Sequence, residues 1–135
     1  MAGVRNALQG RITQVDMLAP VSTATLGVES GTFDCRAYPH GSRFVAAFST
    51  GAMTEGTLTY SVVDCDTSGG TYAAVATTYG TLPTATTDTD NVTVYQAFEP
   101  NPARPFIKLK GVETVSVTTA VPVHQYILVI PPTGV

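Results

Sequence analysis

Apolar and polar residues alternate along much of the chain with a period of two. Leu58, Tyr60 and Val62 alternate with Thr59 and Ser61. Successive side chains of a β-strand point to opposite faces of a sheet, so this pattern predicts a strand with one buried face. The same reasoning predicts further strands, separated by turns rich in Gly, Pro, Asn and Asp. The predicted strands are residues 23–28, 32–38, 43–49, 57–65, 71–78, 92–98, 105–110, 114–119 and 124–130.

The last predicted strand differs from the others because it is apolar on both faces. Residues 126–130 read Tyr-Ile-Leu-Val-Ile, with no polar residue at alternate positions. A strand that is covered on both sides lacks the usual alternation. We therefore expect either a central strand or a strand whose outer face is covered by a neighbouring chain.

The beginning of the chain does not follow a strand pattern. Residues 1–10 show no period of two, and residues 11–18 alternate only irregularly before Pro20, which we expect to end this first strand. We therefore divide the chain into an N-terminal arm with a possible first strand, residues 1–18, and a β-sandwich domain, residues 19–135. Residues 77–91 are rich in Thr, Pro and Asp and predict a long exposed loop.

The composition supports an all-β fold. The chain contains 22 Thr and 17 Val, and side chains that branch at Cβ favour a pleated sheet over a helix. Strand signals that recur every 8–12 residues or so are typical of sandwiches and jelly rolls. The sequence therefore predicts a single-domain all-β sandwich, jelly-roll-like, with an extended N-terminal arm.

The chain carries little charge for its size. Charged residues make up 13% of the sequence, against about 25% in typical soluble domains. The net charge of −3 argues against a nucleic-acid partner, which requires a basic surface. No apolar run reaches the roughly 20 residues that span a membrane, and the first residues contain no signal-peptide block, so we expect no membrane partner and synthesis in a cytoplasm.

The candidate metal ligands are few. Cys35 and Cys65 have no further Cys or His at the spacing of a zinc site, and His40 and His124 are isolated in the sequence. Because disulfides are rare in the cytoplasm, we expect both cysteines to be free thiols.

The other candidate motifs are better explained as structural turns than as metal-binding or catalytic sites. Residues 64–69 match the first half of a calcium loop, but Val75 occupies the position of the bidentate carboxylate. The chain contains no G-x-S-x-G motif and no phosphate-binding loop. We therefore expect no metal, no cofactor and no enzymatic activity.

The candidate partner-binding residues are apolar or basic residues of the arm and basic residues of one later strand. They are Val4, Arg5, Leu8, Arg11, Ile12, Arg104, Lys108 and Lys110. A solvated tail gains nothing from apolar side chains, so we expect the arm to bind a partner or to clamp a neighbouring subunit. Two interpretations of the later basic residues remain open: protection of an edge strand from aggregation, and docking to an acidic protein surface.

Three segments resemble a known family. Residues 58–75 read as a strand, a polar Asp-Thr-Ser-Gly-Gly turn, then an aromatic residue and an Ala-Ala-Val strand. Residues 104–111 (Arg-Pro-Phe-Ile-Lys-Leu-Lys-Gly) and the closing Tyr-Ile-Leu-Val of residues 126–129 fit the same layout. Over residues 57–130 the chain resembles the small capsid decoration (cement) proteins of tailed bacteriophages, with Cys65 in place of a more typical polar residue.

This resemblance implies a β-sandwich or jelly-roll protein without enzymatic activity. Such a protein binds the outer surface of the phage head, which is built from the major capsid protein. The low charge agrees with a surface that partners cover, because interface cores are depleted of charged residues. We expect a homotrimer at threefold or quasi-threefold positions of the virion, with a twofold dimer as the second choice, and the arm as the capsid-binding or subunit-clamping element.

Two other functions remain open. A carbohydrate-binding sandwich on a phage tail or a cell surface would present exposed aromatic rings, and although Trp is absent, Tyr72, Tyr79 and Tyr95 could serve. A tail-tube or head–tail connector subunit would also be a virion component. The copy number in purified virions would separate these functions, because a decoration protein should approach the copy number of the major capsid protein.

Overall fold

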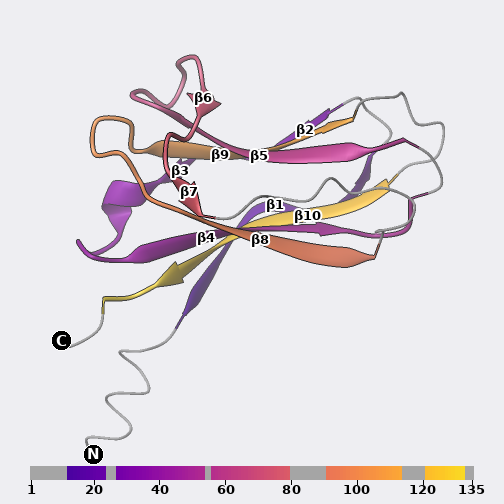
Figure 1. Ribbon diagram of the computed structural model, residues 1–135, viewed down its shortest axis with the longest axis horizontal. Coiled ribbons are helices and arrows are strands. Elements are labelled where there is room, and N and C mark those ends of the chain that lie inside the picture. The colour runs from indigo at the N-terminus through magenta and orange to yellow at the C-terminus, as the bar shows by residue number, and fades with distance from the viewer. Residues whose placement is uncertain (1–11, 24–26, 54–55, 80–90, 114–120, 133–135) are drawn as a thin grey trace, which may run out of the picture.

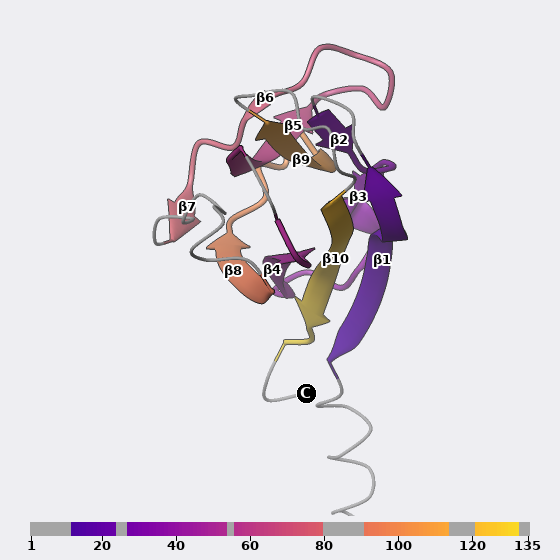
Figure 2. The ribbon, with the colours of Figure 1, turned by 90° about the vertical axis from the view of Figure 1, so that its right-hand side faces the viewer.

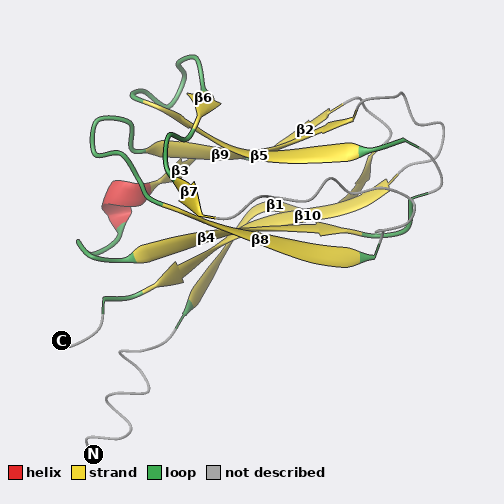
Figure 3. Ribbon diagram, in the orientation of Figure 1, coloured by secondary structure: helices red, strands yellow, loops and turns green. Residues whose placement is uncertain are grey.

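The computed structural model describes residues 12–23, 27–53, 56–79, 91–113 and 121–132, with the backbone alone at residues 19–23, 27, 28, 113 and 121. In this part of the chain ten strands form two antiparallel sheets that pack face to face (Figure 1). A single turn of 3₁₀ helix, Cys35–Ala37, is the only helical segment among these residues (Figure 3). The predicted all-β sandwich is therefore confirmed.

The first sheet, sheet A, is the lower layer in Figure 1 and has the strand order β1-β10-β4-β8-β7. In that order its strands are Thr13–Thr23, Val121–Ile130, Arg43–Thr50, Val92–Phe98 and Thr78–Tyr79. The apolar strand β10 lies between β1 and β4, so the prediction of a central strand is confirmed.

The second sheet, sheet B, is the upper layer and has the order β2-β9-β5-β6, and β3 also pairs with β9. Its strands are Gly27–Glu29 (β2), Phe106–Glu113 (β9), Leu58–Cys65 (β5), Ala73–Ala74 (β6) and Phe33–Asp34 (β3). The chain passes from one sheet to the other between most successive strands, so covalent connections link the two sheets at several points.

The core lies between the sheets and is rich in aromatic rings. Phe44 stacks on Phe98 with 5.9 Å between ring centroids and meets Phe33 edge-on at 5.6 Å. Farther along the sandwich, the ring centroids of Phe48 and Tyr60 lie 4.8 Å apart. The predicted alternation of β5 is confirmed, because Leu58, Tyr60 and Val62 are all buried in this core.

Backbone contacts close the two sides of the sandwich, which Figure 2 shows end-on. On one side, the Gly31 amide of sheet B's edge segment donates to the Met17 carbonyl of β1 at 3.2 Å. On the other side, the chain runs from β6 in sheet B directly to β7 in sheet A. Residues 71–78 were expected to form one strand, and the crossing divides them between two sheets instead.

The prediction that Pro20 ends the first strand is wrong, because β1 continues from Thr13 to Thr23. Register shifts flank Leu18, and β1 is an edge strand, where a proline costs no hydrogen bond to a second neighbour. Gly111 and Pro122 were likewise expected between strands and lie within β9 and β10. The strand expected at residues 114–119 lies outside the described residues.

Candidate functional site

The centre of the outer face of sheet A is apolar. In β4, Phe44, Ala46 and Phe48 point into the core and are buried, so Val45 and Ala47 between them point outward. The same alternation turns the side chains of Tyr126, Leu128 and Ile130 outward from β10, where they are half-buried. A surface of this kind is unusual for a sheet that faces water, where the outer positions are mostly polar.

The strand register brings outward residues from four strands together. Tyr79 pairs with Ala97, Ala97 with Val45, and Val45 with Leu128, which makes one row across the sheet. In the next row Ala47 lies between Tyr95 and Tyr126. We call these seven residues the tyrosine face: Val45, Ala47, Tyr79, Tyr95, Ala97, Tyr126 and Leu128.

Two tyrosines cover the centre of this face. A hydrogen bond joins the side chains of Tyr95 and Tyr126, and this bond, followed by burial, raises the pKa of Tyr126 to about 12. Ala47 lies beneath them and is 0% exposed, although it points away from the core. A small residue at this position therefore allows the two rings to meet above it.

Polar contacts extend this pair to the edge of the sheet at β1. The imidazole of His124 packs against the ring of Tyr126, with 4.9 Å between centroids, and its Nε2 lies 3.0 Å from Oδ1 of Asp16. The Gln14 amide donates to the same oxygen at 3.0 Å. The hydrogen bond from Gln14, and then that with His124, lowers the pKa of Asp16. The tyrosine face thus has a polar border on this side.

A groove with a volume of about 580 Å³ occupies one end of the tyrosine face. Its walls include the apolar side chains of Val45, Ala97 and Ile130. At its margin the Tyr79 hydroxyl donates to Oε2 of Glu99 at 3.2 Å, and this hydrogen bond raises the pKa of Tyr79. Tyr79 and Tyr95 remain 59% and 56% exposed, so aromatic surface is open in this region.

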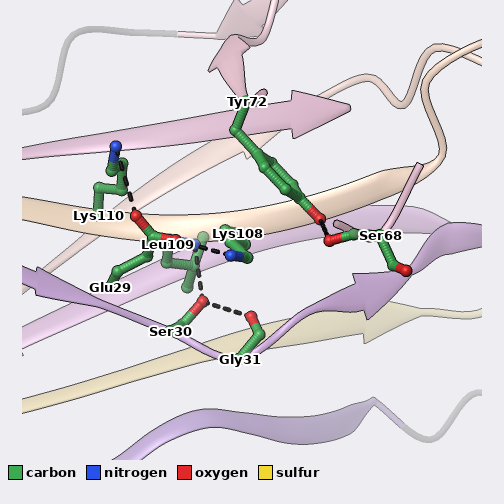
Figure 4. Close-up of polar contacts among 8 residues, drawn as sticks. All are labelled: Glu29, Ser30, Gly31, Ser68, Tyr72, Lys108, Leu109 and Lys110. Carbon is green, nitrogen blue, oxygen red and sulfur yellow. Dashed lines mark hydrogen bonds and ion pairs between the residues drawn. The ribbon is translucent and has the colours of Figure 1, made fainter. Parts of the chain in front are cut away.

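The outer face of sheet B has the opposite character (Figure 4). Lys108 Nζ lies 2.7 Å from Oε1 of Glu29, and Lys110 Nζ lies 3.4 Å from Oε2 of the same carboxylate. Lys108 also lies over the ring of Tyr72, 4.6 Å from its centroid, and the Tyr72 hydroxyl donates to the Ser68 carbonyl at 2.9 Å. The hydrogen bond from Lys108 is the main cause that lowers the pKa of Glu29. We call this surface, with Glu29, Lys108 and Lys110 at its centre, the charged face.

Arg104 has a structural partner within the chain. Its Nε lies 2.6 Å from Oδ1 of Asp64, and a second guanidinium nitrogen donates to the Asp64 carbonyl at 2.7 Å. The Asp64 side chain is only 3% exposed. Because the Arg104 amide also donates to the Asn101 carbonyl at 2.8 Å, the arginine fixes the turn before β9 against β5.

The structure describes only part of the predicted partner-binding set. Val4, Arg5, Leu8 and Arg11 lie outside the described residues. Ile12 is 52% exposed just before β1 of sheet A, whereas Lys108 and Lys110 belong to sheet B, so the structure does not bring these residues together.

Sequence reasoning did not identify the tyrosine face as a surface. Two signals pointed to parts of it: the strand at residues 126–130 that is apolar on both sides, and the naming of Tyr79 and Tyr95 as candidate exposed rings for a carbohydrate. Tyr79 and Tyr95 join that strand only through pairing across the sheet, which a local pattern does not specify.

The cysteines are free thiols, as the sequence predicts. Asp34, the neighbour of Cys35, and Cys65 pair with Phe106 from opposite sides, so two strand spacings of about 4.8 Å separate them. A disulfide requires Cα atoms within about 7 Å. Burial, followed by the nearby Asp34 carboxylate, raises the pKa of Cys35 to about 12, so this thiol is not poised to react.

Within the described ranges, no three His, Cys, Asp or Glu side chains gather in a group that could hold a metal ion. The same ranges contain no helix that is long and apolar enough to cross a membrane.

Comparison with known proteins gives no relative from which a role could be inferred. No protein-family model, no curated protein and no solved structure matches this chain. The chemistry of the two outer faces is therefore the basis for assigning a function.

Proposed function

We propose that this protein is a capsid decoration protein of a tailed bacteriophage, a virion structural component without enzymatic activity. In this proposal the tyrosine face binds the major capsid protein on the outer surface of the head. The observation that carries the proposal is the contrast between an open apolar face on sheet A and a charged face on sheet B whose charges are already paired.

The tyrosine face has the composition of an interface core. Tyr residues are enriched among the residues that dominate binding energy, because they combine a large apolar ring with a hydroxyl group. Polar and charged residues surround the apolar centre, namely Asp16 and His124 on one side and Arg43 and Glu99 at the groove. An apolar centre with a polar rim is the usual arrangement of protein–protein interfaces.

The area of sheet A's outer face also fits a docking surface. The four long strands of sheet A, β1, β10, β4 and β8, are spaced about 4.8 Å apart, and roughly six residues of about 3.3 Å in each cover about 380 Å². The largest apolar patch of a monomer covers some 300–600 Å² and is often functional. One such face supports only modest affinity for the shell. Attachment of an oligomer at several points would raise the overall affinity.

The strand order supports the finer description of the fold as a jelly roll. Four strands of one sheet, β1-β10-β4-β8, face β2-β9-β5-β6 of the other, and the chain crosses between them repeatedly. Two such four-stranded sheets are typical of jelly rolls, which are common in viral capsid proteins. This is a likeness of fold and adds to the proposal only as an analogy.

The proposal includes the remaining expectations from the sequence. The partners are the major capsid protein and further copies of this chain, with a homotrimer favoured over a dimer, and neither nucleic acid nor a membrane is a partner. The protein would be made in the host cytoplasm and located on the outer surface of the virion.

Reconstitution on empty shells tests the proposal. Phage heads that lack the protein are mixed with the wild-type chain, with Tyr95→Asp, and with the matched control Thr59→Asp, which places the same charge on an exposed position of sheet B. Circular dichroism first establishes that all three proteins are folded. We expect the wild type and the control to bind equally, and Tyr95→Asp to bind at least 100-fold more weakly.

Two results would contradict the proposal. The first is a wild-type protein that does not bind shells at all, and the second is equal binding by Tyr95→Asp. Quantification of the chain in purified virions adds an independent measure, because we expect a copy number comparable to that of the major capsid protein.

The exposure of Tyr79 and Tyr95 favours one alternative, a carbohydrate-binding module of a phage tail or cell surface. Exposed aromatic rings can stack on the apolar face of a sugar ring. Titration with soluble oligosaccharides separates the two functions: saturable binding that Tyr79→Ala abolishes, together with no binding to shells, would support the alternative.

A further inference from the structure

We propose that the groove at the end of the tyrosine face binds an apolar segment of the major capsid protein that carries a carboxylate group, and that Arg43 pairs with this carboxylate. The inference rests on the proposed function and deepens it, because it assigns the chemistry of the partner at one place on the docking surface. It depends on three features: the pairing of the basic side chains, the position of Glu99 and the apolar walls of the groove.

Arg43 differs from the other basic residues that the structure describes. It is exposed at the start of β4 and lines the groove, and no acidic side chain of the described ranges forms an ion pair with it. The other four each have a carboxylate partner within the chain: Arg36 with Asp34, Arg104 with Asp64, and Lys108 and Lys110 with Glu29. A guanidinium group presents two parallel N–H donors that match a carboxylate. Among these five side chains, Arg43 is therefore the one available to an acidic group of a partner.

Glu99 lies near Arg43 but does not pair with it. Phe44 pairs with Phe98, so the antiparallel register places Arg43 opposite Glu99, and both residues line the groove. Oε2 of Glu99 instead accepts a hydrogen bond from the Tyr79 hydroxyl at 3.2 Å. The groove therefore combines a carboxylate that already has a hydrogen-bond donor with a guanidinium group that has no carboxylate partner in the described part of the chain. This difference favours an occupant with a carboxylate over one with an ammonium group.

Apolar side chains lie directly beside Arg43. Ile130 pairs with Arg43 between β10 and β4, and Val45 pairs with Ala97 in the next outward row. These three half-buried apolar residues contribute to the walls of the groove, which has a volume of about 580 Å³. An apolar chain that covers the walls removes water from around the guanidinium group, and a lower local dielectric strengthens an ion pair there. The expected occupant is therefore a carboxylate with an apolar part next to it.

The groove and the tyrosine face form one continuous surface, because Val45, Tyr79 and Ala97 belong to both. A partner that covers the tyrosine face therefore also covers the groove. Tyr and Arg are enriched among the residues that dominate binding energy, and Arg43 adds an arginine to the exposed tyrosines of this surface. Because the proposed partner of the tyrosine face is the major capsid protein, we assign the carboxylate to that protein.

Small probes test the chemistry of the groove without shells. The purified full-length chain is titrated with hexanoate, and with hexanol and hexylammonium, which have an apolar chain of the same length but a neutral or a positive group. Amide chemical shifts measured by NMR report the binding. We expect hexanoate to shift the signals of Val45 and Ala97 saturably, and to bind at least about 10-fold more tightly than hexylammonium. Equal or tighter binding of hexylammonium, or no shift of these signals by hexanoate, overturns the proposal.

Three variants, each shown to be folded by circular dichroism, locate the carboxylate. Arg43→Gln removes the proposed partner, and the matched control Lys110→Gln removes a positive charge from the charged face. Glu99→Gln removes a neighbouring negative charge, which repels an anionic probe. We expect hexanoate to bind at least about 10-fold more weakly to Arg43→Gln, unchanged to Lys110→Gln, and more tightly to Glu99→Gln. Unchanged binding by Arg43→Gln, or weaker binding by Glu99→Gln, contradicts the assigned pairing.

The same variants on empty phage heads test the source of the carboxylate. We expect Arg43→Gln to bind shells at least about 10-fold more weakly than the wild type and Lys110→Gln. Shell binding that Tyr95→Asp weakens and Arg43→Gln does not leaves the proposed function intact and overturns this inference. A wild-type chain that does not bind shells overturns the proposed function and the assignment of the segment to the capsid protein, whereas the hexanoate titration still decides whether the groove binds a carboxylate.

Discussion

The outer faces of sheets A and B are built on the same strand geometry but use their side chains differently. On the charged face, Lys108 and Lys110 share the carboxylate of Glu29, and Lys108 also lies over a tyrosine ring. On the tyrosine face, Tyr79 and Tyr95 are more than half exposed, and their hydroxyl groups are engaged while most of each ring is open. A charged cluster with internal partners has less to gain from docking than an open aromatic surface, so the less charged face is the better candidate for a partner.

The difference has a structural origin in the chain that follows β5. Val63 and Cys65 point outward from sheet B, yet they are only 6% and 2% exposed. The segment between β5 and β6 folds over this end of the sheet, with Tyr72 near Lys108. Among the described residues, no comparable segment covers the tyrosine face of sheet A.

The largest expected effect separates two basic residues of sheet B. Arg104→Met leaves the Asp64 carboxylate buried without a positive partner, so we expect the free energy of unfolding to fall by about 3 kcal/mol. Lys108→Met breaks an exposed pair and should cost less than about 1 kcal/mol. Urea unfolding of the two variants measures the difference, and equal losses would show that the Arg104–Asp64 pair does not anchor its turn.

The next effect concerns the segment that covers sheet B. A Cβ atom at Gly70 would lie 2.5 Å from Sγ of Cys65 and 2.5 Å from Oγ1 of Thr67, whereas a Cβ at Gly69 meets nothing within 4 Å. We therefore expect Gly70→Ala to lower the free energy of unfolding by about 1–3 kcal/mol. The matched control Gly69→Ala should change it much less. Similar melting temperatures for both variants would indicate that the turn adjusts freely.

The sequence predicted the sandwich well, because most of its strands can be recognised from the pattern of apolar and polar residues within each strand. The alternation of Leu58, Tyr60 and Val62, and the boundaries of β8, follow from residues that are near in sequence. Pro20 misled the prediction because the tolerance of a strand for proline depends on whether it lies at an edge, and that is a property of the whole sheet.

The candidate site was much harder to predict. The two-sided apolar pattern at residues 126–130 indicated either a central strand or a strand whose outer face is covered by a neighbouring chain, but Tyr79 and Tyr95 reach it through pairing between distant segments. The basic residues in and near β9 were easy to find in the sequence, but their roles were not. Arg104, Lys108 and Lys110 are close in sequence and similar in charge, yet their partners Asp64 and Glu29 lie in other strands. Whether a charge is free or paired depends on such non-local contacts.

A smaller effect tests the centre of the tyrosine face. Tyr95→Phe removes the hydroxyl that is hydrogen-bonded to Tyr126, which is the main cause of the raised pKa of that residue. We expect the pKa of Tyr126 to move from about 12 toward the ordinary value of about 10. The loss of unfolding free energy should be about 0.5–1.5 kcal/mol, as for a typical hydrogen bond. Titration by ultraviolet absorbance, with Tyr79→Phe as the control, measures the shift; an unchanged titration would mean that the bond is absent in solution.

The smallest effect appears on the charged face as a dependence on pH. Lys108, and more weakly Lys110, lowers the pKa of Glu29 in the folded chain. A carboxyl group with a lowered pKa stabilises the fold at pH values above its unfolded pKa of about 4.3, and this contribution is lost as the pH falls through the lowered folded value. Because the Glu29 side chain is 43% exposed, the difference in unfolding free energy between the wild type and Glu29→Gln should stay below about 1 kcal/mol at neutral pH. It should disappear in acid, and Glu29→Gln in a Lys108→Met background should show a weaker dependence, since only Lys110 then remains. Urea unfolding at a series of pH values gives these differences, and a Glu29→Gln effect that grows as the pH falls would contradict the assigned pairing.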